Sequence, residues 1–449
     1  MAFQSVKISL PSASLFRFPP NPNSGWIPPP SAGSTSFAPP VDIPDHIYNA
    51  VLDPKVPITI AVIYAVTAKA LNAYNKSTGK KPWAISKTLA FRWFVIAHNI
   101  FLAVYSAWTW WGMLGTLRRT MVSPLGPQGV AGFLDSMCQI NGPAGIGNAA
   151  FFDEKTNSWT SYSPDSVLTE EGLPSRLTAG RMWNEGLAFY GWLFYLSKFY
   201  EVFDTLIILA KGKLSSTLQT YHHAGAMMCM WAGMRYMAVP IWIFCFFNSF
   251  IHAIMYTYYT VTAFNIRVPM IIKRSLTSMQ ITQFLVGGSG AMVHSFLSYT
   301  IPVIAGSQTD VPSSSASAVA SNESVVAATG KLDDYKGEYA RQTMPCITSS
   351  GQTFAIWLNV FYLAPLTYLF VSFFIESYLR RSNSASQARK PATRRLSNNV
   401  QMAEKAGWEA AKNVEREVYG ESNEEAVLSD GKKANGKASA NGRVLRSRQ

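Results

Sequence analysis

Residues 240–264 read PIWIFCFFNSFIHAIMYTYYTVTAF, an apolar and aromatic run without Asp, Glu, Lys or Arg. A helix needs about 20 mostly apolar residues to cross the hydrocarbon core of a bilayer, and this run is long enough. Similar apolar stretches occur near 57–73, 90–115, 186–210, 216–237, 279–305 and 353–377. The sequence therefore predicts an all-α membrane protein with seven transmembrane helices.

Composition favours a membrane protein over a soluble one. Only 14% of the 449 residues are charged, compared with about 25% in an average soluble protein, and 48% are hydrophobic. The 39 basic and 26 acidic residues leave a net charge of +13, which in a soluble protein would suggest a nucleic-acid partner. Here the basic residues gather in short connections and in the tail, so no nucleic acid is expected as a partner.

The basic connections orient the predicted helices. Under the positive-inside rule, short connections rich in Lys and Arg face the cytosol. Such connections follow the first, third, fifth and seventh stretches, at Lys76, Lys80, Lys81, Lys87, Lys211, Lys213, Arg267, Lys273, Arg274, Arg380 and Arg381. We therefore expect a cytosolic C-terminus and a lumenal N-terminus, with the long loops 116–185 and 306–352 on the lumenal side.

Two polar segments flank the predicted membrane domain at 57–380. Residues 1–56 are rich in proline, cannot propagate a helix and are predicted to form a flexible arm. Residues 381–449 are polar, basic and of low complexity, and are predicted to be a disordered cytosolic tail. The sequon at Asn322, in the loop 306–352, is a candidate glycosylation acceptor.

Charged side chains inside the third apolar stretch indicate a buried polar cluster. Lys198, Glu201 and Asp204 are each three residues apart, so they occupy about a third of the helix surface. A charge at the centre of a membrane helix costs roughly 2.5–3.5 kcal/mol on insertion scales, and such groups face the bundle interior. An ion-pair cluster that holds helices together is one interpretation; we favour a functional site.

The fourth stretch begins with Gln219-Thr220-Tyr221-His222-His223. Adjacent helical residues diverge by about 100°, so one imidazole can reach a cavity while the other contacts a neighbouring helix. Gln219 lies one turn before both and can hydrogen-bond a ring nitrogen. A lone membrane histidine is usually a packing residue, but this pair at a helix start, next to buried carboxylates, indicates chemistry.

The fifth stretch carries a polar face. Asn248, His252, Met255 and Tyr259 follow a 4–3–4 spacing and share one side of the helix, with Tyr256 beside them. Aromatic side chains at this spacing usually belong to the core, whereas Asn and His do not. In the sixth stretch, Thr277, Gln280 and Gln283 form a further uncharged polar side, which alone is a weak signal.

The histidine count argues against a di-iron oxidase. Membrane desaturases and hydroxylases hold two irons with about eight histidines, because imidazole fills most coordination positions. This chain has six histidines, of which His46, His98 and His294 lie away from the paired motif. The remaining three cannot complete such a centre, and no metal site is expected.

Four motifs resemble those of the ELO family of very-long-chain fatty acid elongases. They are KxxExxDT at Lys198, Glu201, Asp204 and Thr205, the end of HxxHH at His222-His223, NxxxHxxMYxYY at Asn248–Tyr259, and TxxQxxQ at Thr277, Gln280 and Gln283. They occur in the family's order, and with the apolar stretches the resemblance covers about 57–380. It implies a seven-helix barrel that encloses an acyl tunnel.

One position departs from the family pattern. Gln219 stands where the first histidine of HxxHH is expected. Many family members that elongate polyunsaturated chains carry QxxHH, so the resemblance favours such acyl chains without fixing their length. It also implies that this position is not the nucleophile.

The resemblance implies a decarboxylating Claisen condensation in the endoplasmic reticulum membrane. Long-chain acyl-CoA and malonyl-CoA would give 3-oxoacyl-CoA two carbons longer, CO2 and CoA, without a cofactor. The implied partners are membrane lipid, the reductases and dehydratase of the elongation cycle, and a second copy of the chain in a homodimer.

The family's reaction needs an acyl acceptor, and no cysteine is arranged with the histidine motifs to supply a thiolate. We assign His222 as the nucleophile, His252 as the group facing it, and His223 and Gln219 as groups that orient it or relay protons. The carboxamides of Asn248, Gln280 and Gln283 would polarise the enolate oxygen. The carboxylates of Glu201 and Asp204 would anchor the histidines. The substrate-binding set, whose cations would hold CoA phosphates, is Lys198, Lys211, Lys213, Lys273, Arg274, Tyr256 and Tyr259.

The four cysteines fall into two groups. Cys229 and Cys245 lie in apolar stretches, where no disulfide is expected. Cys138 and Cys346 lie in the two long loops, both assigned to the lumenal side, an oxidising compartment. We predict a disulfide between them; two unrelated free thiols are the alternative, because spacing says nothing about Cα distance.

A protein of another class could share the apolar stretches. A seven-span transporter or receptor for a lipid-like ligand would also be aromatic-rich and contain intramembrane charges. It would not need paired histidines facing a third one, and its pocket would open to the outside. The histidine motifs therefore favour the enzyme.

Overall fold

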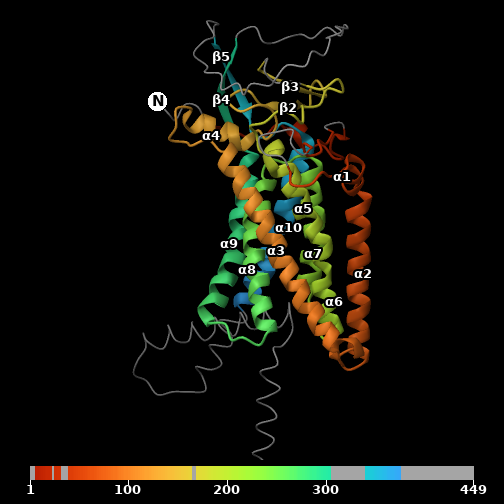
Figure 1. Ribbon diagram of the computed structural model, residues 1–449. Helices are drawn as coiled ribbons and strands as arrows, with labels where there is room; N and C mark the ends of the chain where they lie inside the picture. Colours follow the sequence, from red (N-terminus) through yellow and green to blue (C-terminus); the bar gives the residue numbers. More distant parts are fainter. Residues whose placement is uncertain (1–5, 23–24, 32–38, 164–167, 305–338, 376–449) are drawn as a thin grey trace, which may run out of the picture.

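The computed structural model (Figure 1) describes residues 6–22, 25–31, 39–163, 168–304 and 339–375. Long helices run side by side, and small β-sheets cover one end of the bundle, called the cap end below. The opposite end, where the first two long helices are joined, is called the basic end. The helices of the bundle are α2 (Lys55–Ser77), α3 (Leu89–Thr120), α5 (Ala188–Tyr200), α6 (Val202–Ala210), α7 (Thr217–Arg235), α8 (Ile241–Ala263), α9 (Met270–His294) and α10 (Ser350–Ile375).

Four helices in the described part of the chain are long and apolar enough to cross a membrane. They are α2, α3, α8 and the segment Ser350–Val371 of α10. The protein is therefore a multi-pass membrane protein, and the prediction of seven spans is confirmed only for these four. In α7 the polar residues of the histidine segment lower the apolar content, and α5 and α6 are each shorter than a span.

The third predicted span is a broken helix. A short π-helix, η5 (Trp183–Leu187), leads into α5, and Glu201 separates α5 from α6. Glu201 has φ −61° and ψ −13°, so the chain turns within one residue and continues as a helix. The break lies inside the predicted polar cluster, and hydropathy alone could not reveal it.

The prediction of an all-α protein is wrong at the cap end. The antiparallel sheet β1-β4-β5 and the hairpin β2-β3 lie there. In addition, the sixth stretch, expected as helix over 279–305, leaves the helix at His294 and continues as a strand. That strand contains Pro302 and four β-branched residues, Thr300, Ile301, Val303 and Ile304, which fit a strand better than the interior of a helix. The strands are β1 (Val6–Ile8), β2 (Ala150–Asp153), β3 (Ser158–Ser161), β4 (Leu297–Ile304) and β5 (Tyr339–Pro345).

Short helices lie at both ends of the bundle. The cap end holds α4 and α1, and the basic end holds a 3-10 turn between α2 and α3. The largest buried cluster lies around α5 and α7 and includes Trp183, Phe189 and Tyr195, each at most 1% exposed. The short helices are η2 (Ala13–Phe16), α1 (Asp45–Val51), η4 (Ala84–Lys87) and α4 (Gly129–Cys138).

The described part of the proline-rich segment is docked on the cap end, which differs from the expected flexible arm. The Trp183 indole donates to the Ile27 carbonyl at 2.8 Å. Arg235 donates to the carbonyls of Gly25 and Pro22, and its guanidinium lies 4.0 Å from the centre of the Trp26 ring. Proline prevents a helix but leaves backbone carbonyls free as acceptors, which explains how such a segment can still pack.

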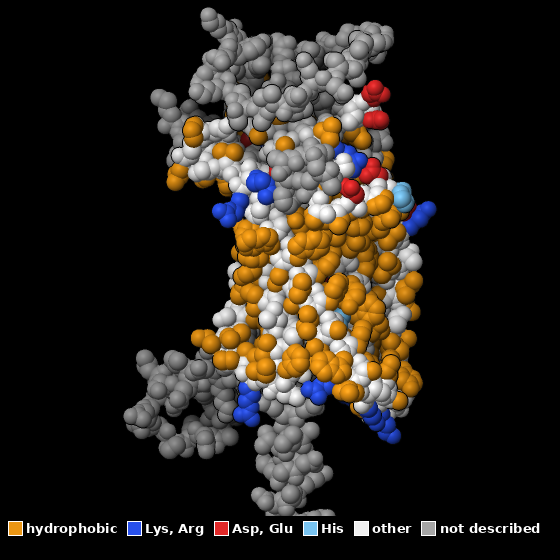
Figure 2. All heavy atoms as spheres, in the orientation of Figure 1, with side chains coloured by type: hydrophobic (Ala, Val, Ile, Leu, Met, Phe, Trp, Pro, Cys, Tyr) orange, Lys and Arg blue, Asp and Glu red, His pale blue; other side chains and the backbone are white. Residues whose placement is uncertain are grey.

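The surface of the bundle matches a membrane environment. Figure 2 shows a broad belt of hydrophobic side chains on this face, with Lys and Arg side chains both above and below it and acidic side chains only above it. Ile63, Val104, Trp111 and Phe361 are each at least 60% exposed. Exposed apolar area of this extent is covered by lipid rather than water. The predicted cytosolic tail and the Asn322 sequon lie outside the described residues.

Candidate active site

A buried ion pair lies at the end of α5, and a hydrogen bond from its lysine reaches α8. The Lys198 Nζ donates to Glu201 Oε1 at 2.7 Å and to Asn248 Oδ1 at 3.2 Å. The side chains of Lys198 and Glu201 are 4% and 2% exposed. The Ser197 hydroxyl also donates to Glu201 Oε1, and His252 Nδ1 lies 3.5 Å from the same oxygen. Removing such charges from water is costly, so the pair is better explained by a polar site than by stability.

Asp204 forms a second centre one turn further along the chain. Its Oδ1 lies 2.7 Å from His98 Nε2, and its Oδ2 accepts from the Tyr256 hydroxyl at 2.6 Å. Next to it, the hydroxyls of Thr205 and Tyr64 are 2.8 Å apart. The carboxylate therefore anchors a histidine of α3, which lies outside the paired histidine motif.

The main cavity opens beside these groups and has a polar and an apolar wall. It contains about 520 Å³ of empty space, including the part open at its mouth. Lys198, His222, Asn248 and Gln283 contribute its polar side chains near the ion pair. Towards the cap end the wall is apolar apart from Asn359, and its apolar residues are Ala226, Met230, Ile243, Phe244, Gly287 and Leu363.

The paired histidines point to different neighbours. His222 lines the cavity, and its Nδ1 lies 2.9 Å from the Tyr362 hydroxyl of α10. His223 is 6% exposed, and its ring meets the ring of Tyr64 in α2 edge to face. The two imidazole centroids are 5.4 Å apart. Of the pair, His222 is therefore the side chain that a ligand in the cavity would contact.

Of the four predicted carboxamides, Asn248 and Gln283 line the cavity, whereas Gln219 and Gln280 are not among the described residues that line it. Asn248 Nδ2 donates to Gln283 Oε1 at 3.3 Å, so these two link α8 to α9 at the polar wall. Gln280 Nε2 instead donates to the Met255 sulfur at 3.2 Å. Gln219 is 3% exposed, and neither atom of its amide has a hydrogen-bond partner among the described residues.

The remaining motif residues of α8 lie behind the polar wall. His252, Tyr256 and Tyr259 are buried but are not among the described residues that line the cavity. The Tyr256 ring centre lies 5.7 Å from that of His252 and 6.1 Å from that of Tyr259. His252 therefore reaches the cavity groups through Glu201 rather than directly.

The basic end brings together cations from two connections. Asn75, at the end of α2, donates to the carbonyls of Leu209 and Lys213, each at 2.8 Å. Gly212, with φ +76°, packs so closely that a Cβ atom there would lie 2.5 Å from the Lys80 carbonyl oxygen. Lys211 and Lys213 thus lie beside the chain that carries Lys80. The side chains of Lys273 and Arg274, in the first turns of α9, lie outside the described part of the structure.

Two residues of the site, His98 and Tyr362, were not among the assigned catalytic residues. His98 is a polar residue within the apolar stretch 90–115, a signal that could have selected it. Tyr362 has no such signal, because aromatic residues are common in the stretch 353–377 and Tyr368 is a second tyrosine there. Only the packing of α10 against α7 shows that Tyr362 contacts His222.

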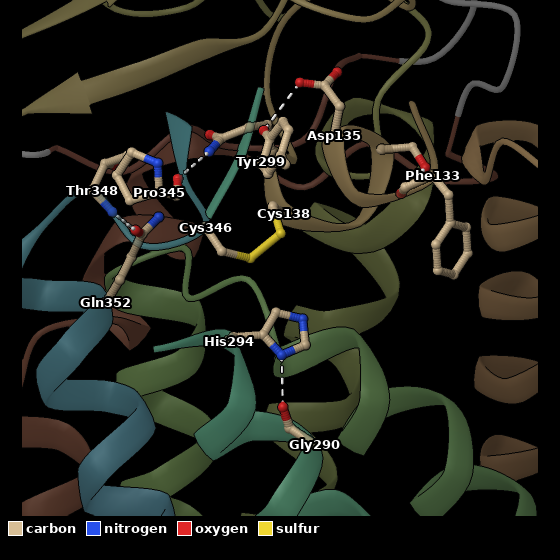
Figure 3. Close-up of a disulfide and its surroundings, with 12 residues drawn as sticks. Phe133, Asp135, Cys138, Gly290, His294, Tyr299, Pro345, Cys346, Thr348 and Gln352 are labelled. Carbon is tan, nitrogen blue, oxygen red and sulfur yellow. Dashed lines mark hydrogen bonds between the residues drawn. A yellow bond between two sulfur atoms is a disulfide. The ribbon is translucent and has the colours of Figure 1, made fainter. Parts of the chain in front are cut away.

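The cap end contains a disulfide between Cys138, the last residue of α4, and Cys346, which follows β5 (Figure 3). Their Cα atoms are 4.7 Å apart, although 208 positions separate them in sequence. Beside the bond, the Tyr299 hydroxyl donates to Asp135 Oδ1 at 3.0 Å. Burial, and the carboxylate beside it, raise the pKa of Tyr299, which keeps the phenol protonated as a donor. Cys229 and Cys245 are free and buried.

Comparison with known proteins gives matches to one family. A model of the "ELO: GNS1/SUR4 family" matches residues 49–386. The chain is 35% identical over 104 residues to "Very long chain fatty acid elongase 3" of Homo sapiens, covering 23% of this chain and 38% of that protein. It is 26% identical over 254 residues to "Very long chain fatty acid elongase 7" of Drosophila melanogaster, covering 56% of this chain and 60% of that protein.

A third relative gives a similar result. "Putative fatty acid elongase 4" of Caenorhabditis elegans is 26% identical over 231 residues, covering 51% of this chain and 60% of that protein. The chain thus spans 38–60% of the length of these three relatives. The family model covers far more of the chain, including all the motif residues and every long helix of the bundle. Because the family model matches most of the chain, the protein belongs to the ELO (GNS1/SUR4) family.

Proposed function

We propose that this protein is the condensing enzyme of fatty acid elongation, which joins long-chain acyl-CoA to malonyl-CoA. The observation that carries the proposal is the main cavity. It presents His222, Lys198 and Asn248 at its polar wall and an apolar wall beyond them. An acyl chain would occupy the apolar part and place its thioester carbon beside the imidazole, within the polar part.

The first half of the reaction is acyl transfer to His222. An imidazole nitrogen attacks the thioester carbon and CoA leaves, as the motif assignment requires. Lys198 lies in the same wall as His222, and its charge is held there by Glu201. A fixed positive charge stabilises the oxyanion that develops during the attack.

The second half joins the two chains. Loss of CO2 from malonyl-CoA leaves an enolate, and the carboxamides of Asn248 and Gln283 line the cavity where that oxygen would lie. Their mutual hydrogen bond holds them in place, which limits reorganisation during the reaction. His252, 3.5 Å from Glu201, would relay protons to this wall through the carboxylate.

The basic end supports the proposed orientation and substrate access. Lys80, Lys211 and Lys213 lie at that end, and the positive-inside rule assigns such clusters to the cytosol. CoA phosphates would bind there, so the C-terminus is cytosolic and the cap end is lumenal. In this arrangement α5 with α6, α7 and α9 would add three spans to the four apolar helices, giving seven.

The proposed location is the endoplasmic reticulum membrane. The 3-oxoacyl-CoA product needs ketone reduction, dehydration and a second reduction, so enzymes of these three classes would have to be close. A fluorescent fusion of the full chain should co-localise with an endoplasmic reticulum marker. A signal mainly at the plasma membrane would contradict this location and favour a receptor or transporter.

The proposed reaction can be tested with the purified full-length protein in lipid nanodiscs. It would be incubated with malonyl-CoA labelled at the free carboxyl carbon and with acyl-CoA substrates of graded length and unsaturation. We expect labelled CO2 that depends on acyl-CoA, and a 3-oxoacyl-CoA product detected by mass spectrometry. Absence of both with every acyl-CoA would contradict the enzyme and favour a lipid-binding transporter or receptor.

Substitution of Phe244 is expected to change product length. Phe244 and Asn359 line both the main cavity and a second cavity towards the cap end, so the Phe244 ring stands between them. The second cavity is bounded by small residues such as Gly233 and Ala291. Phe244→Ala should join the two cavities and shift products by at least one additional two-carbon step, measured by chromatography of the products.

The matched control for this prediction is Phe247→Ala. Phe247 lines the main cavity but does not border the second one. Phe247→Ala removes the same side-chain atoms but leaves the Phe244 ring between the two cavities, so product length should stay as in the wild type. Identical product distributions for Phe244→Ala and the wild type would show that the two cavities do not form one tunnel.

A further inference from the structure

The Tyr362 hydroxyl bridges two atoms of one histidine. Its oxygen lies 2.9 Å from His222 Nδ1 and 2.9 Å from the His222 backbone carbonyl oxygen. A carbonyl oxygen can only accept a hydrogen bond, and a phenol has a single proton to donate. The phenol proton must therefore go to the carbonyl, because the two oxygens would otherwise face each other without a hydrogen between them.

This arrangement determines which ring nitrogen of His222 carries the proton. Once the phenol proton is used, the contact at Nδ1 requires that Nδ1 carry a hydrogen and donate it to the phenol oxygen. A neutral imidazole has one N–H, so Nε2 then keeps its lone pair. We propose that Tyr362 is a positioning residue that holds His222 as the Nδ1–H tautomer and leaves Nε2 as the nucleophile of acyl transfer.

The packing of α7 against α10 explains how Tyr362 reaches this position. Gly225 lies one turn after His222, and a Cβ atom at Gly225 would overlap the Tyr362 ring. The absence of a side chain there lets the ring lie against α7. The backbone of Tyr362 is held by the Tyr221 hydroxyl, which donates to its carbonyl at 3.2 Å. The bridging hydroxyl is thus fixed from both helices.

The tautomer gives a balanced acyl transfer, and this step depends on the proposed function. The Nε2 lone pair attacks the thioester carbon, the N–C bond forms, and the C–S bond breaks with its electron pair on the CoA thiolate, which takes a proton from water. The histidine keeps its Nδ1 proton, so the acyl group is carried on an imidazolium whose N–H donates to Tyr362.

The second half of the reaction restores the same tautomer. The malonyl carboxylate leaves as CO2, and its bonding pair becomes the carbanion that attacks the acyl carbon. The C–N bond breaks, and its electron pair returns to Nε2. The positive charge of the acyl-imidazolium and the negative charge of the carbanion cancel in this step. The histidine is therefore neutral again and still carries the Nδ1 proton. Tyr362 therefore needs to exchange no proton during the cycle.

The kinetic test compares Tyr362→Phe with Tyr368→Phe in the full-length protein. The measured step is transfer of a labelled acyl group from acyl-CoA to the protein without malonyl-CoA, with rapid quenching. Tyr362→Phe removes the acceptor of the Nδ1 proton and should slow this step by about 10- to 100-fold, with KM for acyl-CoA changed by less than about twofold. Tyr368→Phe removes a hydroxyl from an exposed tyrosine of the same helix that does not line the cavity, and should acylate at the wild-type rate.

A spectroscopic test reads the tautomer without relying on activity. Nitrogen-15 NMR of histidine-labelled protein in lipid should show a protonated Nδ1 and an unprotonated Nε2 for His222, assigned by comparison with His222→Gln. Tyr362→Phe should shift this signal towards the other tautomer. A protonated Nε2 in the wild type, or unchanged acylation in Tyr362→Phe, would overturn the proposal. Absence of CO2 release by the wild type would contradict the proposed function instead, while the nitrogen shifts still report the tautomer.

Discussion

Replacing His222 with alanine is expected to abolish condensation and leave the protein folded. His222 lines the main cavity and is only partly buried, so truncation removes the acyl acceptor with little loss of packing. Removal of a nucleophile that forms a covalent intermediate should lower kcat by at least about 10³-fold. The measurement is CO2 release from carboxyl-labelled malonyl-CoA, together with a melting curve of the purified variant.

The matched control is His46→Ala. His46 is exposed on α1, away from the cavity, so the same substitution should leave both activity and melting temperature unchanged. His252→Ala should also abolish condensation, because it removes the group beside Glu201. Turnover near the wild-type level in His222→Ala would rule out the acyl-imidazole route, although the protein would still be an elongase.

Hydropathy predicted the four helices that are apolar over enough of their length to cross a membrane. The stretches that became α2, α3, α8 and α10 were located within a few residues, because lipid selects for continuous apolar length. The break at Glu201 was not predictable, since the flanking residues favour helix on both sides. Nor was β4, because its register depends on β5, and their paired residues Tyr299 and Met344 are far apart in sequence.

Helical spacing in the sequence predicted the residues of the site that share one helix, but not the contacts between helices. Lys198 and Glu201 were selected because they are one turn apart, and the structure pairs them directly. Contacts between helices cannot be read from spacing within one helix. Asp204 contacts His98 of α3 and Tyr256 of α8. His222 contacts Tyr362 of α10, so His98 and Tyr362 reach the site only when the bundle packs.

Removal of the Cys138–Cys346 bond is expected to destabilise the protein strongly. The bond closes a loop of 208 positions, for which the chain-entropy model gives stabilisation on the order of 5 kcal/mol. It ties α4 to the segment between β5 and α10, beside the Tyr299–Asp135 hydrogen bond. Cys138→Ala/Cys346→Ala should therefore have a markedly lower melting temperature than the wild type in detergent.

The control for the disulfide is Cys229→Ala/Cys245→Ala, because both of these buried cysteines are free. This variant should lose only local packing and should still respond to a reductant, as the wild type does. The Cys138→Ala/Cys346→Ala variant should not respond, because its melting temperature no longer depends on a bond that can be reduced.

Non-reducing mass spectrometry should recover the two cysteines in one cross-linked peptide pair. Alkylatable thiols at both positions would contradict the bond, and their modification by a cytosol-restricted reagent in intact cells would also overturn the lumenal position of the cap, since disulfides persist in oxidising compartments.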